Sequence, residues 1–275
     1  MRHHPNERVF IHSDTLPIDF FHRFTTNGYQ VYIRRFDFEK YDPNAPGYDW
    51  IQKKEKWKVV SPYYHVHIAD FWRLHLIWKY GGSYVDFDHI FTKSFADLHS
   101  AVGTEHCHVG CMDFKKLEPS FPGLYKQAQA LGMENTTVFL ANGLVIRFPP
   151  KEPALELALC RLIKQYTPTD WGTIGPALWT LVFGEMPGSL QIQRPEEFFP
   201  FAWSEVGNVL NNKQADVELE KKLLYSHGFH LFRGSAGQRV NSPNIIFKLL
   251  KDILAFGELE GMIKVDFNYN DTLQL

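Results

Sequence analysis

Residues 69–88 read A-D-F-W-R-L-H-L-I-W-K-Y-G-G-S-Y-V-D-F-D, and this stretch decides the fold. Its first part carries apolar side chains at the spacing of one buried helical face: Phe71, Leu74, Ile77 and Trp78. We therefore expect a helix over the block from Ile68 to Tyr80. Gly81 suits the left-handed position after a helix, where a Cβ would clash.

The second part of this stretch predicts a strand over residues 83–87, with Asp86 and Asp88 at its carboxyl end. Side chains two apart on a strand point to one side, so both carboxylates can reach one point while Val85 and Phe87 face the core. Two carboxylates repel unless a cation joins them. At the carboxyl end of a strand, this pair indicates an oxygen-ligand site for Mn²⁺ or Mg²⁺. The same tripeptide also occurs by chance in loops.

Outward from this stretch, the N-terminal residues alternate between strand and helix patterns. Val9–His12 predict a strand, Pro17 opens a helix through Phe24, Asn27-Gly28 close it, and residues 30–33 predict a second strand. The order strand, helix, strand indicates an α/β domain with parallel strands.

The rest of the chain gives a coarser pattern. We expect an exposed excursion over 37–58, a loop over 103–123, two strands within 136–148, a helix over 153–166, a loop and helix over 171–184, and a last amphipathic helix from Ser242 to Gly257. No internal repeat or low-complexity segment interrupts these elements.

Composition limits the function. The 275 residues carry 29 basic and 31 acidic side chains, a formal net charge of −2, so no basic field gathers nucleic acid, and we expect no nucleic-acid partner. No apolar run reaches the ~20 residues that span a bilayer, and three cysteines form no disulfide framework. We therefore expect a soluble, cytoplasmic chain, whose oligomeric state the sequence leaves open.

Asp70 and Arg73 lie three residues apart, on one face of the expected helix. They can pair with each other at the surface, an interaction worth under about 1 kcal/mol. Alternatively, the carboxylate and the guanidinium can together hold the hydroxyls of a sugar, one accepting and the other donating hydrogen bonds.

The combined pattern resembles the sugar-binding region with the DxD motif of retaining glycosyltransferases. The A-D-x-x-R at 69–73 and the G-G-S-Y-V-D-F-D at 81–88 stand at the spacing typical of that group. Three further blocks are similar to the α-1,4-glycosyltransferases and follow each other in the same order. They are F-L-A-N-G at 139–143, W-G-T-I-G-P-A-L-W-T-L-V-F at 171–183 and F-F-P-F-A-W at 198–203.

The resemblance implies a GT-A fold, a Rossmann-like mixed sheet flanked by helices. It implies a single domain over 1–275, with a nucleotide-sugar part over roughly 1–150 and an acceptor-side part with a C-terminal closing segment over roughly 151–275. It also implies Mn²⁺ or Mg²⁺ as cofactor, a nucleotide-sugar donor such as a UDP-sugar, a glycan or glycoside acceptor, and retention of configuration.

Individual roles follow from the same resemblance. Asp88 would be the more direct metal ligand, Asp86 would share the ion, and Asn142 would lie near the anomeric carbon, which makes these three the expected catalytic residues. The expected substrate-binding residues are Ser13, Asp14, Asp70, Arg73, Tyr84, Asn142 and Gly143. No residue is singled out as a nucleophile.

A histidine from the C-terminal part is expected to complete the metal shell. His230 resembles the histidine in the H-x-W of the α-1,4 group, and His227 is the alternative, while either can be structural instead. Arg233 and Arg239 stand where a loop could cover a pyrophosphate.

Other assignments stay open at this point. Glu105-His106-Cys107-His108 with Cys111 has ligands for zinc but no second half of a site. A D-x-D phosphohydrolase is the alternative enzyme, although there the motif would follow the first strand and precede a threonine, whereas His89 follows here. A catalytically silent glycan-binding relative is the third possibility.

Overall fold

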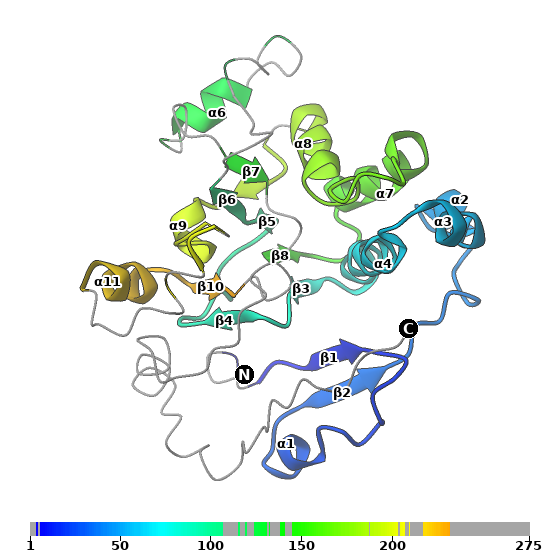
Figure 1. The fold of residues 1–275 in the computed structure, drawn as a ribbon, viewed down its shortest axis with the longest axis horizontal. Coiled ribbons are helices and arrows are strands. Elements are labelled where there is room, and N and C mark those ends of the chain that lie inside the picture. Colours follow the sequence, from blue (N-terminus) through cyan, green and yellow to red (C-terminus); the bar gives the residue numbers. More distant parts are fainter. Residues whose placement is uncertain are drawn as a thin grey trace.

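The computed structural model describes residue 4 and residues 6–106, 115, 119, 124–130, 132, 138–140, 145–186, 188–202, 204–206, 209 and 217–231. Within these residues the fold is a mixed α/β structure in which helices surround four small sheets (Figure 1). The expected helix from Ser242 to Gly257 lies outside the described residues. The mixed α/β class is confirmed.

The N-terminal strands are β1 (Val9–His12) and β2 (Val31–Arg34), which pair in parallel with Val9 opposite Val31. Between them α1 covers only His22–Thr26. The predicted helix start at Pro17 was wrong, because the chain there forms separate turns, such as Phe20 N–H to Pro17 O, and Pro17 to Phe20 are exposed. The predicted closure is confirmed: Asn27 caps the helix, and Gly28 has a φ of +85°.

The prediction of an exposed excursion over 37–58 was wrong. The segment forms α2 (Tyr48–Ile51) and α3 (Lys54–Val60), which bury Trp50, Ile51 and Trp57. Trp57 Nε1 donates a hydrogen bond to Trp50 O at 2.9 Å, so the two short helices hold each other. Charged residues and prolines mark the outer side of this segment, while its tryptophans enter the core.

The central helix α4 runs from Tyr64 to Tyr80 and begins earlier than predicted. It is buried on more than one face, because Asp70, Arg73, His67 and His75 are buried together with its apolar residues. Gly81 ends it with a φ of +69°, as predicted, and a Cβ there would lie 2.7 Å from Pro150 Cδ. The chain therefore turns sharply from α4 into the next strand.

The largest sheet has the order β3-β8-β5-β9. Its strands are β3 (Gly82–Val85), β8 (Val145–Phe148), β5 (Ala101–Val102) and β9 (Gln191–Ile192). β8 is antiparallel to both β3 and β5, and β5 is parallel to β9. The two strands expected within 136–148 both exist, but they pair with different partners instead of forming one hairpin.

Two further sheets have two strands each. The strand β6 (Thr104–His106) pairs antiparallel with β7 (Val138–Leu140), so the expected loop over 103–123 begins with a strand. The strand β4 (His89–Phe91) pairs antiparallel with β10 (Gly228–His230).

The remaining helices are α6 (Leu124–Ala130), α7 (Pro153–Gln165), α8 (Pro176–Glu185), α9 (Pro195–Phe198) and α11 (Val217–Tyr225). Both α7 and α8 agree with the sequence prediction. The main core joins α4, α7 and α8 with α2 and α3, helices that lie in the same half of Figure 1. It includes the fully buried Trp50 and Trp179. This core takes residues from both sides of position 150, while the single-domain division stays a prediction.

Candidate metal and sugar site

The Asp-x-Asp motif lies in a turn between two sheets. β3 ends at Val85, residues 87 and 88 form the turn, and the N–H of His89 donates to Asp86 O. The predicted strand over 83–87 was therefore too long, because the chain leaves β8 after Val85 and joins β10 at His89. The expectation that Val85 and Phe87 face the core was also wrong: both are exposed, Phe87 by 80%.

Pairing of β4 with β10 brings a histidine to this turn from far along the chain. His230 stands opposite His89 in the ladder, and the N–H of Leu231 donates to Asp88 O at 2.9 Å. The ladder is anchored by Phe229, which is fully buried, and by Thr92 Oγ1, which donates to Ser226 O at 2.7 Å. His230 thus reaches the motif through backbone pairing, not through a loop.

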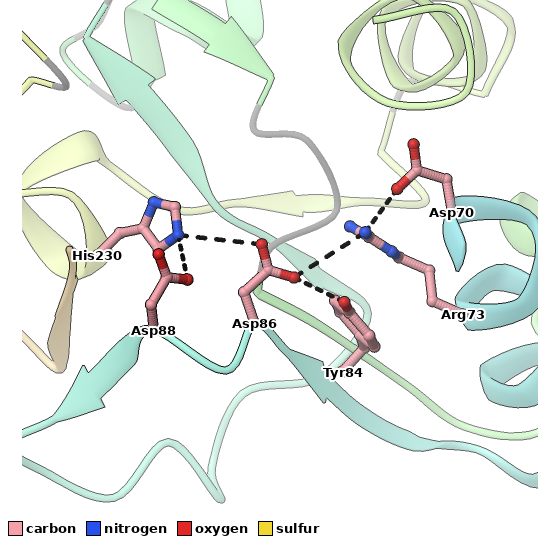
Figure 2. Close-up of polar contacts among 6 residues, drawn as sticks. All are labelled: Asp70, Arg73, Tyr84, Asp86, Asp88 and His230. Carbon is pink, nitrogen blue, oxygen red and sulfur yellow. Dashed lines mark hydrogen bonds and ion pairs between the residues drawn. The ribbon is translucent and has the colours of Figure 1, made fainter. Parts of the chain in front are cut away.

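The side chains of Asp86, Asp88 and His230 converge (Figure 2). One ligand atom of each lies within 4.8 Å of the others. His230 Nε2 is 2.8 Å from Asp88 Oδ1 and 3.9 Å from Asp86 Oδ2. Two carboxylates and an imidazole can together hold a divalent metal ion, since oxygen and nitrogen ligands suit such ions.

Next to this group lies a buried ion pair from α4. Arg73 Nη2 is 2.5 Å from Asp70 Oδ1 and 3.9 Å from Asp86 Oδ1, so the guanidinium stands between the two carboxylates (Figure 2). The alternative of a surface pair was wrong, because both side chains are buried. Burial raises the pKa of the Asp70 carboxyl to about 6, since Arg73 lowers it only in part and Asp86 raises it further.

Tyr84 connects the pair to the motif. Its hydroxyl donates a 2.6 Å hydrogen bond to Asp86 Oδ1, and its ring lies under Arg73, with Cζ 4.2 Å from the ring centroid. Burial raises the pKa of the phenol far above its ordinary value, so the hydroxyl keeps its proton. Asp86 is therefore oriented by Tyr84 and Arg73 on one side and faces His230 on the other.

Two residues beside His230, the buried His89 and the partly buried Glu105, were missed as site residues. Burial, helped by the charge of His230, lowers the pKa of His89 to about 3, and both ring nitrogens of His89 are buried without a hydrogen-bond partner in the described structure. Burial raises the pKa of Glu105 in β6 to about 7, against the opposing effect of His230. His89 follows the motif directly, but nothing in the local sequence of Glu105 connects it with residue 230.

The expected substrate-binding residues Ser13 and Asp14 follow β1 and carry local turns. Ser13 Oγ accepts from the N–H of Leu16 at 3.1 Å, and Asp14 Oδ1 accepts from the N–H of Phe36 at 3.1 Å. Neither forms a hydrogen bond with Asp86 or Asp88 within the described residues. The strand end is tied to the helix that carries Asp70 and Arg73, because Trp72 Nε1 donates to His12 Nδ1 at 3.1 Å.

Of the two candidate histidines, the structure brings only His230 to the aspartates. His227 Nδ1 lies 2.8 Å from Ser94 O, and its Nε2 is 3.4 Å from a carboxylate oxygen of Glu197. The expected residues Asn142 and Gly143 lie outside the described residues, as do Trp203, Arg233, Arg239, Cys107, His108 and Cys111.

The mixed α/β fold, the Asp-x-Asp turn that meets a histidine, and the buried Asp–Arg pair agree with the resemblance to DXD glycosyltransferases found in the sequence. Comparison with known proteins confirms this resemblance: residues 1–106 match the family described as "Glycosyltransferase sugar-binding region containing DXD motif". The chain is also distantly homologous to lactosylceramide 4-alpha-galactosyltransferase.

The mouse lactosylceramide 4-alpha-galactosyltransferase is 24% identical over 185 residues, which cover 63% of this chain and 42% of that protein. The human protein is 24% identical over 227 residues, which cover 78% of this chain and 54% of that protein. The chain thus spans about half the length of these curated relatives. Among solved structures, PaToxG Glycosyltransferase matches over 92% of this chain and 75% of its own, at 16% identity and a TM-score of 0.36.

Within the described residues, no helix combines the length and the apolar character needed to cross a bilayer.

Proposed function

We propose that this chain is a metal-dependent, retaining glycosyltransferase of GT-A fold that moves a hexose from a UDP-sugar to a glycan or glycoside acceptor. The domain division at about residue 150, the Mn²⁺ or Mg²⁺ cofactor and the roles of Ser13, Asp14, Asn142 and Gly143 belong to this proposal. Support for the hexose comes from the relatives, which are named as galactosyltransferases.

One observation carries the proposal: the group Asp86, Asp88 and His230 lies directly beside the buried pair Asp70 and Arg73. Asp86 belongs to both arrangements, since its Oδ2 is 3.9 Å from His230 Nε2 and its Oδ1 is 3.9 Å from Arg73 Nη2. A diphosphate held at the first group would leave an attached sugar close to the second. This is the order of parts that a nucleotide-sugar donor has.

The residues present fit a hard divalent ion. Two carboxylates from one turn give oxygen ligands, and His230 Nε2 faces both of them from β10. Among the residues that the structure describes, no cysteine joins the group, so Mn²⁺ or Mg²⁺ suits it better than a softer ion. When bound, the ion would neutralise negative charge that develops on the leaving diphosphate.

The protein's own residues contribute orientation and charge. The hydroxyl of Tyr84 fixes Asp86 by a 2.6 Å hydrogen bond to Oδ1, so Oδ2 of Asp86 stays directed toward His230. Arg73, buried between Asp70 and Asp86, offers N–H donors in a dry site, where charge-assisted hydrogen bonds are strong. The second oxygen of Asp70 accepts no hydrogen bond from the described residues but is buried, so a sugar hydroxyl would bond to it only after neighbouring side chains move.

The test combines a panel of UDP- and GDP-sugars, Mn²⁺, and two readouts: heat stabilisation and slow hydrolysis of the donor. We expect a UDP-sugar to stabilise the protein only with Mn²⁺ and to be slowly hydrolysed. Asp88→Asn should abolish metal-dependent binding of UDP. Asp97→Asn, the same change at an exposed carboxylate nine residues away, is the matched control and should bind normally.

Arg73→Lys separates the sugar contact from the diphosphate contact. Lysine keeps the charge beside Asp70 but loses the planar fork of donors. We expect weaker binding of the UDP-sugar with nearly unchanged binding of UDP, measured by calorimetry. Equal losses for both ligands would contradict the role of Arg73, and donor binding without any turnover would favour a silent glycan-binding protein instead.

A further inference from the structure

A strongly basic, partly apolar surface lies at α3 and the start of α4. Residues 52–66 read Q-K-K-E-K-W-K-V-V-S-P-Y-Y-H-V, with Lys53, Lys54, Lys56 and Lys58 against the single acidic residue Glu55. This is a local charge of +3 on a chain whose formal net charge is −2. In Figure 1, α3 lies at the outer edge of the molecule.

Apolar side chains stand among these lysines instead of being buried. Val59 is 84% exposed, although it belongs to a helix that has a buried face at Trp57. At about 100° per residue, Val59 points about 160° away from Trp57, with Lys56 on one side and Glu55 and Lys58 on the other. The helix therefore presents a hydrophobic residue, flanked by two cations, to the solvent.

The start of α4 lies near α3, because the ring of Tyr166 contacts both Trp57 of α3 and His67 of α4. The other exposed apolar residues of this surface are Val60, Tyr63, Val66 and Trp171. Trp171 comes to α4 because His67 Nε2 lies 3.1 Å from Asp170 O, and Tyr63 packs near the same imidazole with ring centroids 6.0 Å apart. We call the set Lys53, Lys54, Lys56, Lys58, Val59, Val60, Tyr63, Val66 and Trp171 the α3–α4 surface.

We propose that the α3–α4 surface binds a membrane surface that contains anionic lipids. Lysines are attracted to anionic headgroups, while valine, tyrosine and tryptophan side chains enter the boundary between headgroups and acyl chains. A soluble polyanion would match the lysines but would leave Val59 and Trp171 exposed to water. The combination of charge and exposed apolar residues therefore favours a lipid surface over nucleic acid.

The surface lies on the helix that also carries the buried ion pair. Val66, Asp70 and Arg73 follow each other at spacings of four and three residues, so they lie along one side of α4. At 1.5 Å per residue, Val66 is roughly 6 Å from Asp70 along the helix axis. Binding at the α3–α4 surface would thus place the candidate site close to the membrane, a consequence that does not depend on which reaction the site performs.

The experiment measures sedimentation of the whole chain with vesicles of phosphatidylcholine, with and without 30% phosphatidylserine. We expect binding only with phosphatidylserine, and loss of binding in 0.5 M NaCl because salt screens the attraction. Each lysine near an anionic surface contributes about a fivefold change in binding, so Lys56→Gln combined with Lys58→Gln should weaken it by about 25-fold. Val59→Asp and Trp171→Ala should each weaken it as well.

The matched control lies on α11, where Val217 is 60% exposed and the same helix carries Lys221 and Lys222. Val217→Asp and the pair Lys221→Gln with Lys222→Gln should bind vesicles like the wild type. All changed side chains in α3 are at the surface, so an unchanged Tm shows that the variants are folded.

Three results would overturn the proposal: absence of binding by the wild type, equal losses for the α11 variants, or loss in the lysine variant with none in Val59→Asp and Trp171→Ala. A short DNA duplex is tested in parallel. Duplex binding that depends on the lysines, without vesicle binding, would show that the surface recognises a soluble polyanion instead. Donor binding and hydrolysis are measured separately, so failure of the proposed transferase activity would not affect the vesicle result.

Discussion

Gly228 offers a direct test of how the structure positions His230. A Cβ at Gly228 would lie 2.6 Å from Ile90 O and 2.9 Å from His89 Nε2. The nearest obstacle is a backbone oxygen of the partner strand, which cannot rotate away as a side chain could. Gly228→Ala must therefore displace β10 from β4 by several tenths of an ångström.

The displacement has two expected consequences. Overpacking of this kind costs about 1–3 kcal/mol, and at roughly 2–4 °C per kcal/mol the Tm should fall by several degrees. His230 stands two residues further along the same strand, 2.8 Å from Asp88. Since loss of a positioning contact weakens metal sites by roughly 10–100-fold, we expect a loss of that size in Mn²⁺ affinity.

Thermal unfolding and calorimetric titration with Mn²⁺ measure the two effects. Gly172→Ala is the matched control, because a Cβ there would meet Pro176 Cδ at an ordinary 3.6 Å. The control should keep both Tm and Mn²⁺ affinity. If Gly228→Ala lost stability but bound Mn²⁺ like the wild type, the register of β10 would not position a metal ligand, and His230 would lose its assigned role.

Two further predictions concern stability. Burial, with help from Lys79 and Lys151, lowers the pKa of His75 from 6.5 to about 4, so its stabilising effect is complete above pH 6.5 and is lost as the pH falls toward 4. The free energy of unfolding should therefore fall by about 3 kcal/mol over this pH range, and His75→Phe should remove this pH dependence. Equal pH dependence of urea unfolding in the wild type and in His75→Phe would show that His75 does not titrate this way. Adding Mn²⁺ at 100 times its Kd should raise the free energy of unfolding by about 2.7 kcal/mol, EDTA should reverse this, and a gain retained in Asp88→Asn would place the ion elsewhere.

Elements with strong local patterns could be predicted from the sequence. The parallel strands at Val9–His12 and Val31–Arg34, and the helices α4, α7 and α8, follow from apolar spacing and from proline and glycine at element ends. The segment 37–58 could not be judged in the same way. Its charges and prolines indicate exposure, yet Trp50 and Trp57 pack into the core because α4 and Tyr166 offer them aromatic partners from distant parts of the chain.

The site shows the same limit. Asp70, Arg73, Asp86 and Asp88 could be found because they are close in sequence and their spacing matches a known pattern. Their geometry could not, since a strand was expected where the chain makes a turn, and a surface pair was one expectation for two buried side chains. The spacing of apolar residues in the sequence describes local structure only, whereas the burial of a side chain depends on segments that pack against it from distant parts of the chain.

The turn itself explains why the aspartates can converge on a histidine from 142 residues away. If β3 had continued through Phe87, the carboxylates would have stayed in register with β8, and β4 would have had no free edge at His89. The chain changes partner strands within the motif, and the backbone carbonyls of Asp86 and Asp88 form hydrogen bonds at this change. Asp86 O accepts from the N–H of His89, and Asp88 O accepts from the N–H of Leu231. The second of these hydrogen bonds links the motif to the residue after His230, so the turn that presents the carboxylates also fixes the strand that presents the imidazole.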